Sequence, residues 1–136
     1  MRRFRWWPVF VVSIAAVAIG LSLRGMPDGK LHVWFLDVGQ GDAILVRTPE
    51  GRQILIDGGP KPSALLSEAG SILPYWDRSI DLVILTHADS DHLNGLIPFL
   101  QRYQVATVLD AVHGNGENEW AWADAVKAAG SQTTFK

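Results

Sequence analysis

The pattern of hydrophobic and polar positions divides the chain into an apolar amino-terminal run, three short strand-like segments and a longer alternation of helix-like and strand-like segments. Residues 6–23 contain no charged side chain. Residues 32–37, 43–48 and 53–57 are rich in β-branched, aromatic and aliphatic side chains and are bounded by Gly, Pro and Asp, which is typical of strands joined by tight turns. Their short connections predict an antiparallel meander.

The pattern changes its period after residue 60. Apolar positions at helical spacing predict a helix over residues 63–75, and a short apolar run predicts a buried strand over residues 80–85. A helix over 93–103, a strand over 106–112 and a helix over 118–129 follow. A meander followed by β-α-β units predicts a mixed α/β fold.

Composition and charge limit the chemistry that the chain can perform. It has 136 residues, enough for one modest domain and an appendage. It has no cysteine, so disulfide partners and thiolate metal sites are excluded, and any metal must be held by nitrogen and oxygen ligands. From Arg24 onward there are 9 basic and 14 acidic residues, a net charge of 9 − 14 = −5. An acidic body cannot bind DNA through a broad basic surface, so metal ions would have to supply positive charge to a phosphodiester.

The apolar run of residues 6–23 has the length of a membrane anchor. As a helix it would reach about 27 Å, close to the thickness of a bilayer core. Three arginines precede it and one follows it, so residues 1–24 are predicted to be an anchor in the cell membrane, with a cytoplasmic amino terminus. Residues 25–30 would be a linker to an extracytoplasmic domain over residues 31–136. A cleaved signal peptide and a buried soluble helix are the alternatives. The flanking arginines are Arg2, Arg3, Arg5 and Arg24.

The most informative chemistry lies directly after the apolar run of residues 82–85. Four potential metal ligands fall within six positions, namely His87, Asp89, Asp91 and His92. A buried strand delivers such residues to the carboxyl edge of a sheet, where α/β folds place their sites. Imidazole and carboxylate groups are the ligands expected for Zn²⁺ or Mn²⁺ at a hydrolytic centre. A polar loop that caps a helix is the alternative, but two His and two Asp together favour a metal site.

Two further acidic residues, Asp42 and Asp57, stand beside glycines at predicted strand ends. They could orient ligand imidazoles or bind a metal's water, although Asp is also common in turns for conformational reasons. Gly58 and Gly59 predict a close approach of the backbone to another segment. His113 is a weaker candidate ligand that follows the last predicted strand.

Three motifs occur in an order that resembles the metallo-β-lactamase fold, and more narrowly the extracellular domain of ComEC-type DNA-uptake (competence) proteins. They are residues 35–42 (FLDVGQGD), 54–59 (ILIDGG) and 86–92 (THADSDH), and the resemblance covers about residues 31–112. It implies that residues 31–136 are the first half of a four-layer αββα sandwich with a two-metal hydrolytic site. In the DNA-uptake branch, the resemblance implies a nuclease acting on the strand that is not imported.

The resemblance also implies roles for single residues. His87 and Asp89 match the ligands of a first metal, Asp91 and His92 match those of a second, and Asp91 is in addition the catalytic candidate that orients the attacking water. Asp57 matches the acidic residue behind the site. Most of the family has His where this chain has Asp89, and the extra oxygen ligand makes Mn²⁺ or Mg²⁺ a candidate beside Zn²⁺.

The family's remaining ligands come from a second half that has no counterpart in these residues, so the chain is expected to be a fragment of a longer protein rather than a natural truncation. The leading functional hypothesis is a membrane-anchored, exported metal-dependent hydrolase that cleaves DNA during uptake. A non-catalytic module that assembles with other DNA-uptake components is the alternative. A metallo-β-lactamase-type hydrolase of another ester, such as a lactone or thioester, is the third hypothesis.

Overall fold

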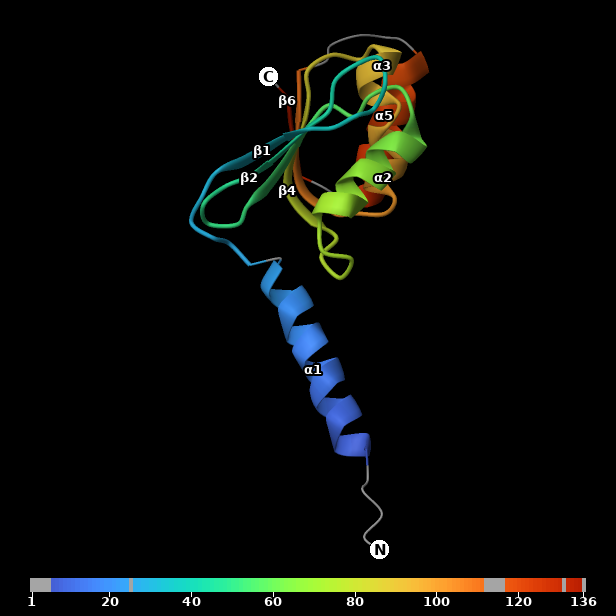
Figure 1. Cartoon of the computed structure of the whole chain (residues 1–136). Coiled ribbons are helices and arrows are strands. Elements are labelled where there is room, and N and C mark those ends of the chain that lie inside the picture. Colours follow the sequence, from blue (N-terminus) through green and yellow to red (C-terminus); the bar gives the residue numbers. More distant parts are fainter. Residues whose placement is uncertain (1–5, 25, 112–116, 131, 136) are drawn as a thin grey trace, which may run out of the picture.

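A computed structural model describes residues 6–24, 26–111, 117–130 and 132–135. Within these residues, six strands form one sheet in the order β1-β2-β3-β4-β5-β6, and helices flank it (Figure 1). In chain order the elements are α1 (Trp7–Arg24), β1 (His32–Phe35), β2 (Ile44–Arg47), β3 (Gln53–Ile56), α2 (Pro62–Ile72), β4 (Ser79–Leu85), α3 (Ser90–Leu93), α4 (Leu96–Leu100), β5 (Gln104–Asp110), α5 (Glu117–Ala129) and β6 (Gln132–Phe135).

The sheet combines an antiparallel and a parallel part. Strands β1, β2 and β3 are antiparallel neighbours, so the predicted meander is confirmed. Strand β3 then pairs in parallel with β4, with Ile56 opposite Ile84, and β4 pairs in parallel with β5. A further parallel strand, β6, was not predicted from the sequence pattern. The expected mixed α/β class is therefore confirmed.

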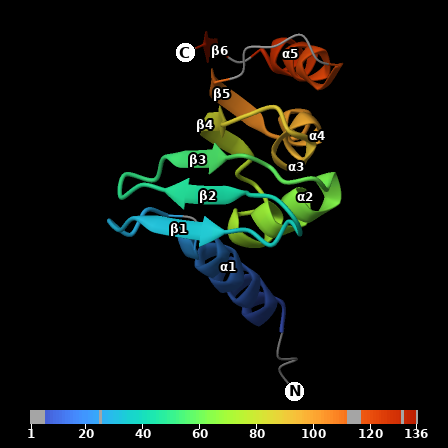
Figure 2. The ribbon, with the colours of Figure 1, turned by 90° about the horizontal axis from the view of Figure 1, so that it is seen from above.

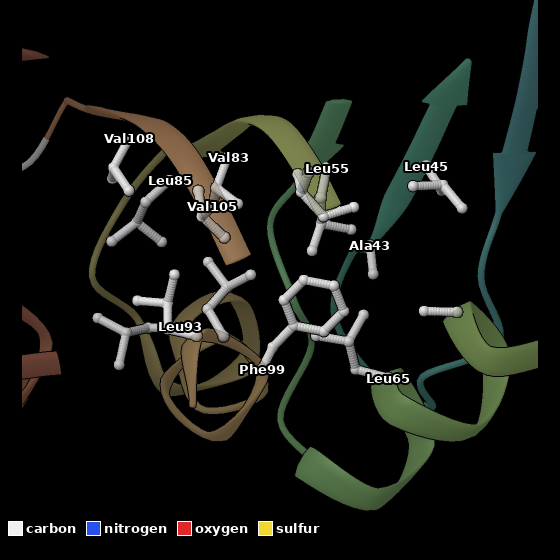
Figure 3. Packing of buried hydrophobic residues seen from close by; sticks show 14 of the residues in the cluster. Ala43, Leu45, Leu55, Leu65, Val83, Leu85, Leu93, Phe99, Val105 and Val108 are labelled. Atoms are coloured by element: carbon white, nitrogen blue, oxygen red, sulfur yellow. The ribbon is translucent and has the colours of Figure 1, made fainter. Parts of the chain in front are cut away.

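Helices α2, α3, α4 and α5 all pack on one face of the sheet (Figure 2). Because side chains alternate across a strand, every second strand residue points toward these helices. Leu45, Leu55 and Val83 do so and are at most 1% exposed. They meet Leu65 and Phe99 from the helices in a continuous apolar core (Figure 3).

The helix predicted over residues 93–103 is confirmed only in part: α4 lies within that range, but it is shorter than predicted and is separated by a break from α3, which ends at Leu93. Pro98 has no N–H to donate to the carbonyl of Asn94, and its ring would clash with that carbonyl in a continuous helix. Gly95, at the break, donates its N–H to the carbonyl of Gly59 instead, at 2.9 Å. A contact with a segment far away in the sequence therefore sets the break.

Helix α1 forms where the apolar run predicts a helix, and it extends away from the sheet (Figure 1). Its side chains from Trp7 to Gly20 are exposed. Among the residues that the structure describes, however, no helix is long and apolar enough to cross a membrane. The predicted transmembrane helix is therefore not supported.

A polar cluster lies at the other end of β3 and β4, where β4 begins. Gln53 is buried, and its side-chain amide donates to Asp77 Oδ2 at 2.7 Å while its backbone N–H donates to Asp81 Oδ2 at 2.8 Å. Burial raises the pKa of Asp77, but hydrogen bonds from Ser79 and Gln53 and the charge of Arg47 outweigh burial and hold that pKa below its ordinary value. These bonds tie the start of β4 to β3 at the end opposite the His/Asp cluster.

Candidate metal centre

The parallel pairing of β3 and β4 brings two sequence motifs to the same edge of the sheet. Asp57 follows the last residue of β3, and Thr86 and His87 follow the last residue of β4. The N–H of Asp57 donates to the carbonyl of Ile84 at 2.9 Å, which continues the ladder by one bond beyond the strand. Residues about thirty positions apart are therefore held side by side at the carboxyl edge, as the sequence pattern predicted.

The carboxylate of Asp57 accepts several hydrogen bonds at this edge of the sheet. It is 3% exposed and has a φ of 55°, a left-handed conformation that is uncommon outside glycine, although Asp is one of the residues that tolerate it. Its Oδ1 accepts the backbone N–H of Thr86 at 2.9 Å. Its Oδ2 lies 2.6 Å from the Thr86 hydroxyl and 3.0 Å from His92 Nδ1.

These bonds fix the orientation of His92. An ionised carboxylate only accepts hydrogen bonds, so the proton between Asp57 and His92 must lie on Nδ1 of the imidazole. The lone pair of His92 then lies on Nε2, the atom available to a metal ion. The side chain of His92 is only 11% exposed, so packing holds the ring in this position as well.

The other predicted ligands gather around the two imidazoles. The rings of His87 and His92 lie 3.8 Å apart between centroids. His87 Nε2 is 3.7 Å from Asp89 Oδ2, and His92 Nε2 is 3.8 Å from Asp91 Oδ2. Two ligands of one tetrahedral ion at the usual bond lengths stand about 3.4 Å apart. Each imidazole therefore faces a carboxylate at nearly the spacing of a shared ion, in the pairs that the family resemblance implied.

Asp57, His87 and His92 each offer an atom within 4.8 Å of the others, which makes Asp57 a geometric candidate for a ligand too. Both of its oxygens already accept hydrogen bonds from protein donors, however. A carboxylate in that state serves better to orient imidazoles than to bind an ion directly. The side chains of Asp89 and Asp91 are 78% and 48% exposed, which leaves their oxygens accessible to an ion.

Glycines allow the surrounding loops to approach one another closely. The N–H of Gly58 donates to the carbonyl of His92 at 2.7 Å, so the predicted close approach at Gly58 and Gly59 is confirmed. A Cβ on Gly95 would overlap the carbonyl oxygen of Gly58, and one on Gly41 would overlap that of Asp91. The three sequence motifs therefore meet at the candidate centre.

The remaining candidates from the sequence have different positions. Asp42 touches the site through its backbone, because its carbonyl accepts the N–H of Gly59 at 3.0 Å, whereas its side chain is exposed. Its predicted role toward a metal's water stays a prediction. His113 lies outside the described residues. His32, another histidine away from the site, begins β1, and its Nε2 lies 2.9 Å from Oδ1 of Asp28, which precedes that strand.

Two features of the edge were missed by the sequence reasoning. The first is Thr86, whose place between a strand and the ligand cluster was the available signal. The second is Asp110, which ends β5 opposite Leu85, is 5% exposed and accepts the indole N–H of Trp122 at 2.8 Å. That bond attaches α5 to the edge that carries the candidate centre.

An open cleft of about 870 Å³ borders the centre. Asp89 and Asp91 line it, and so does Lys61 at the start of α2. A cation beside two carboxylates provides a binding position for an anionic group next to a bound metal ion. Gln40, Pro60 and Ser90 complete the lining.

Comparisons with known proteins agree with this geometry. The family model described as "Metallo-beta-lactamase superfamily" matches residues 36–131. Among solved structures, a metallo-beta-lactamase with a HARLDQ motif from Cronobacter sakazakii aligns with a TM-score of 0.50 and 21% identity, over 71% of this chain and 38% of that chain. The structural likeness concerns the fold alone.

Two curated proteins are also similar to part of this chain. Competence protein ComA of Neisseria gonorrhoeae is 31% identical over 86 residues, which is 63% of this chain and 12% of the relative. Recombination protein 2 of Haemophilus influenzae is 33% identical over 100 residues, which is 64% of this chain and 13% of the relative. The chain thus spans about an eighth of the length of these relatives.

Proposed function

The chain belongs to the metallo-beta-lactamase superfamily, and from the geometry of its site we propose that it is the metal-binding part of a metal-dependent phosphodiesterase that cleaves DNA during uptake. The observation that carries the proposal is the pairing of two imidazole Nε2 atoms with two carboxylates at the end of β4. The similarity to a competence protein and a recombination protein favours DNA as the substrate over other esters.

The donor set fits one or two divalent ions. His87 and Asp89 would hold one ion and Asp91 and His92 a second, with Zn²⁺ and Mn²⁺ the best matches to mixed nitrogen and oxygen ligands. When bound by these residues, a divalent ion would supply Lewis acidity, lowering the pKa of a nearby water and polarising the ester.

The chain's own residues would position the reactants. Asp91 accepts a hydrogen bond from the attacking water and orients it toward the phosphorus. Lys61, which lines the same cleft, pairs with a phosphate oxygen of the substrate. Because the chain from Arg24 onward carries a net charge of −5, this local positive charge is needed to hold a polyanion beside acidic side chains.

Membrane attachment through residues 6–23 belongs to the same proposal, with the domain on the extracytoplasmic side of the cell membrane. The support is the exposed apolar surface of α1, where Phe10 is 67% exposed and Val12 also 67%. Such a surface is stabilised by removal from water. Flotation with lipid vesicles tests it. We expect Phe10→Asp with Val12→Asp to remain unbound, whereas Trp120→Asp, a change at an exposed aromatic residue of α5, should float as the unmodified protein does.

Hydrolysis is tested on the protein as its host produces it. With Mn²⁺ or Zn²⁺ we expect cleavage of bis(p-nitrophenyl) phosphate and of linear DNA, and we expect His87→Ala and His92→Ala to abolish it. His32→Ala is the matched control, because His32 pairs with Asp28 rather than with the site. A well-folded, metal-loaded protein that cleaves neither substrate would reject the nuclease.

A non-catalytic module of a DNA-import assembly is the second candidate, and the net charge of −5 favours it over a DNA-binding nuclease. Under that function, DNA uptake would persist in cells carrying His87→Ala. Cleavage of a lactone or thioester in place of the phosphodiester would instead indicate a hydrolase of another ester.

A further inference from the structure

The hydroxyl of Thr86 lies between the buried carboxylate and the imidazole that the carboxylate does not reach directly. Thr86 Oγ1 is 2.6 Å from Asp57 Oδ2 and 2.8 Å from His87 Nδ1. His92, in contrast, contacts Asp57 itself at 3.0 Å. The two imidazoles therefore have the same carboxylate behind them, one directly and one through a hydroxyl.

The direction of each hydrogen bond follows from proton counting. A hydroxyl has one proton to donate, and a carboxylate can only accept. The short contact between Thr86 and Asp57 must use that proton, because two oxygen lone pairs at this distance would repel each other. The hydroxyl can then only accept from His87, so the proton of that imidazole lies on Nδ1 and the lone pair lies on Nε2.

We propose that Thr86 is a positioning residue that transmits the orienting effect of Asp57 to His87 and keeps His87 Nε2 free to bind a metal ion. This inference rests on the proposed metal site. His87 needs such a bond more than His92 does, because the side chain of His87 is 47% exposed whereas that of His92 is 11% exposed. Packing restrains His92, and hydrogen bonding restrains His87.

The role belongs to the hydroxyl and not to the backbone of Thr86. The backbone N–H donates to Asp57 Oδ1 at 2.9 Å, and any residue except proline at this position would retain that bond. Thr86→Val has the same shape and β-branching but no hydroxyl. It therefore removes the hydrogen-bond relay from Asp57 through the Thr86 hydroxyl to His87 and preserves the end of the strand. Thr86→Ser retains the hydroxyl and loses only a methyl group.

The first experiment records the nitrogen NMR signals of the histidine rings in the metal-free full chain, above about pH 8, where imidazoles are neutral. In the unmodified chain and in Thr86→Ser, we expect the proton of His87 on Nδ1. In Thr86→Val, a substantial population of His87 should carry it on Nε2, while His92 should not change. Retention of the Nδ1 proton of His87 in Thr86→Val would overturn the inference.

The second experiment titrates the same proteins with Mn²⁺ and with Zn²⁺. We expect Thr86→Val to bind about 10-fold to 100-fold more weakly and Thr86→Ser to bind within about 3-fold of the unmodified chain. Equal binding by all three would overturn the role of Thr86 while the proposed metal site stands. If the unmodified chain binds neither ion but His87 responds to Thr86→Val as expected, the proposed function fails and the relay is supported.

Discussion

Replacing Asp57 by Asn tests whether one carboxylate sets the protonation pattern of both imidazoles. The amide has nearly the shape of the carboxylate and tolerates the left-handed φ of 55° at this position. Its oxygen can still accept the backbone N–H of Thr86, which places the amide nitrogen where Oδ2 accepted two hydrogen bonds. That nitrogen donates, so Thr86 Oγ1 and His92 Nδ1 must both become acceptors.

The Asp57→Asn substitution should change the position of the proton on both imidazoles, His87 and His92. The Thr86 hydroxyl, no longer donating to residue 57, donates to His87 Nδ1, and both imidazoles then carry their proton on Nε2. A ligand atom that carries a proton must lose it before it can bind, and loss of such an orienting partner typically weakens metal binding about 10-fold to 100-fold. In free energy this is about 1.4–2.7 kcal/mol.

The structure also predicts how much folding stability each of two substitutions of Asp57 should remove. Asp57→Asn retains hydrogen-bond partners and should cost about 1–2 kcal/mol, the difference between a charged and a neutral acceptor. Asp57→Ala leaves up to three donors without their acceptor at a site that is 3% exposed, so it should cost more, about 3 kcal/mol or above. Calorimetric titration with Mn²⁺ and urea unfolding measure the two quantities separately. Binding by Asp57→Asn as tight as in the unmodified chain would refute the reasoning.

Three further predictions concern a glycine contact beside the centre, the polar cluster at the opposite end of β4, and the cleft. Gly95→Ala places a Cβ against the carbonyl of Gly58 and should lower the free energy of unfolding by about 1–3 kcal/mol in urea titrations. Gly70→Ala is the control, because a Cβ on Gly70 in α2 would meet open space and should raise the free energy of unfolding by about 0.5–1 kcal/mol. Because the pKa of Asp77 is lower in the folded chain than its ordinary value, its ionised form stabilises the fold above pH 4 or so, and that contribution is lost as the pH falls through the folded pKa. The stability difference between Asp77→Asn and the unmodified chain should therefore shrink below about pH 4, and a difference that is constant with pH would contradict this. Lys61→Met should raise KM for bis(p-nitrophenyl) phosphate with little change in kcat, and an unchanged KM would exclude a role in substrate binding.

Short-range patterns predicted the elements of this fold well, because a strand or helix is largely encoded by the spacing of its own apolar positions. The meander and the strand that delivers His87 are examples, and both are present. The break at Gly95 and the hydrogen bonds of Thr86 depend on residues 36 and 29 positions earlier in the chain, namely Gly59 and Asp57. Pro98 is a local signal for the break, but no local pattern identifies Gly59 or Asp57 as the hydrogen-bond partners. Strand β6 was missed because its polar residues lack the apolar signal that indicates strands.

The two faces of the sheet differ in what covers them, and the difference bears on how the site can be studied. Side chains alternate along a strand, and Leu55, Val83 and Leu85 are buried on the helix side, so Ile54, Ile56 and Ile84 lie on the other face, where they are only half-buried. The strand register places Phe35 on that same face, and it is 81% exposed. An apolar sheet face is stable when another layer covers it. The candidate centre lies at the edge of this same sheet, so a loss of activity in the isolated chain could come from the fold as readily as from the ligands. Ring-nitrogen signals and metal titration separate these causes, because a variant that retains the Nδ1 proton of His92 has kept the Asp57 environment and hence the local fold.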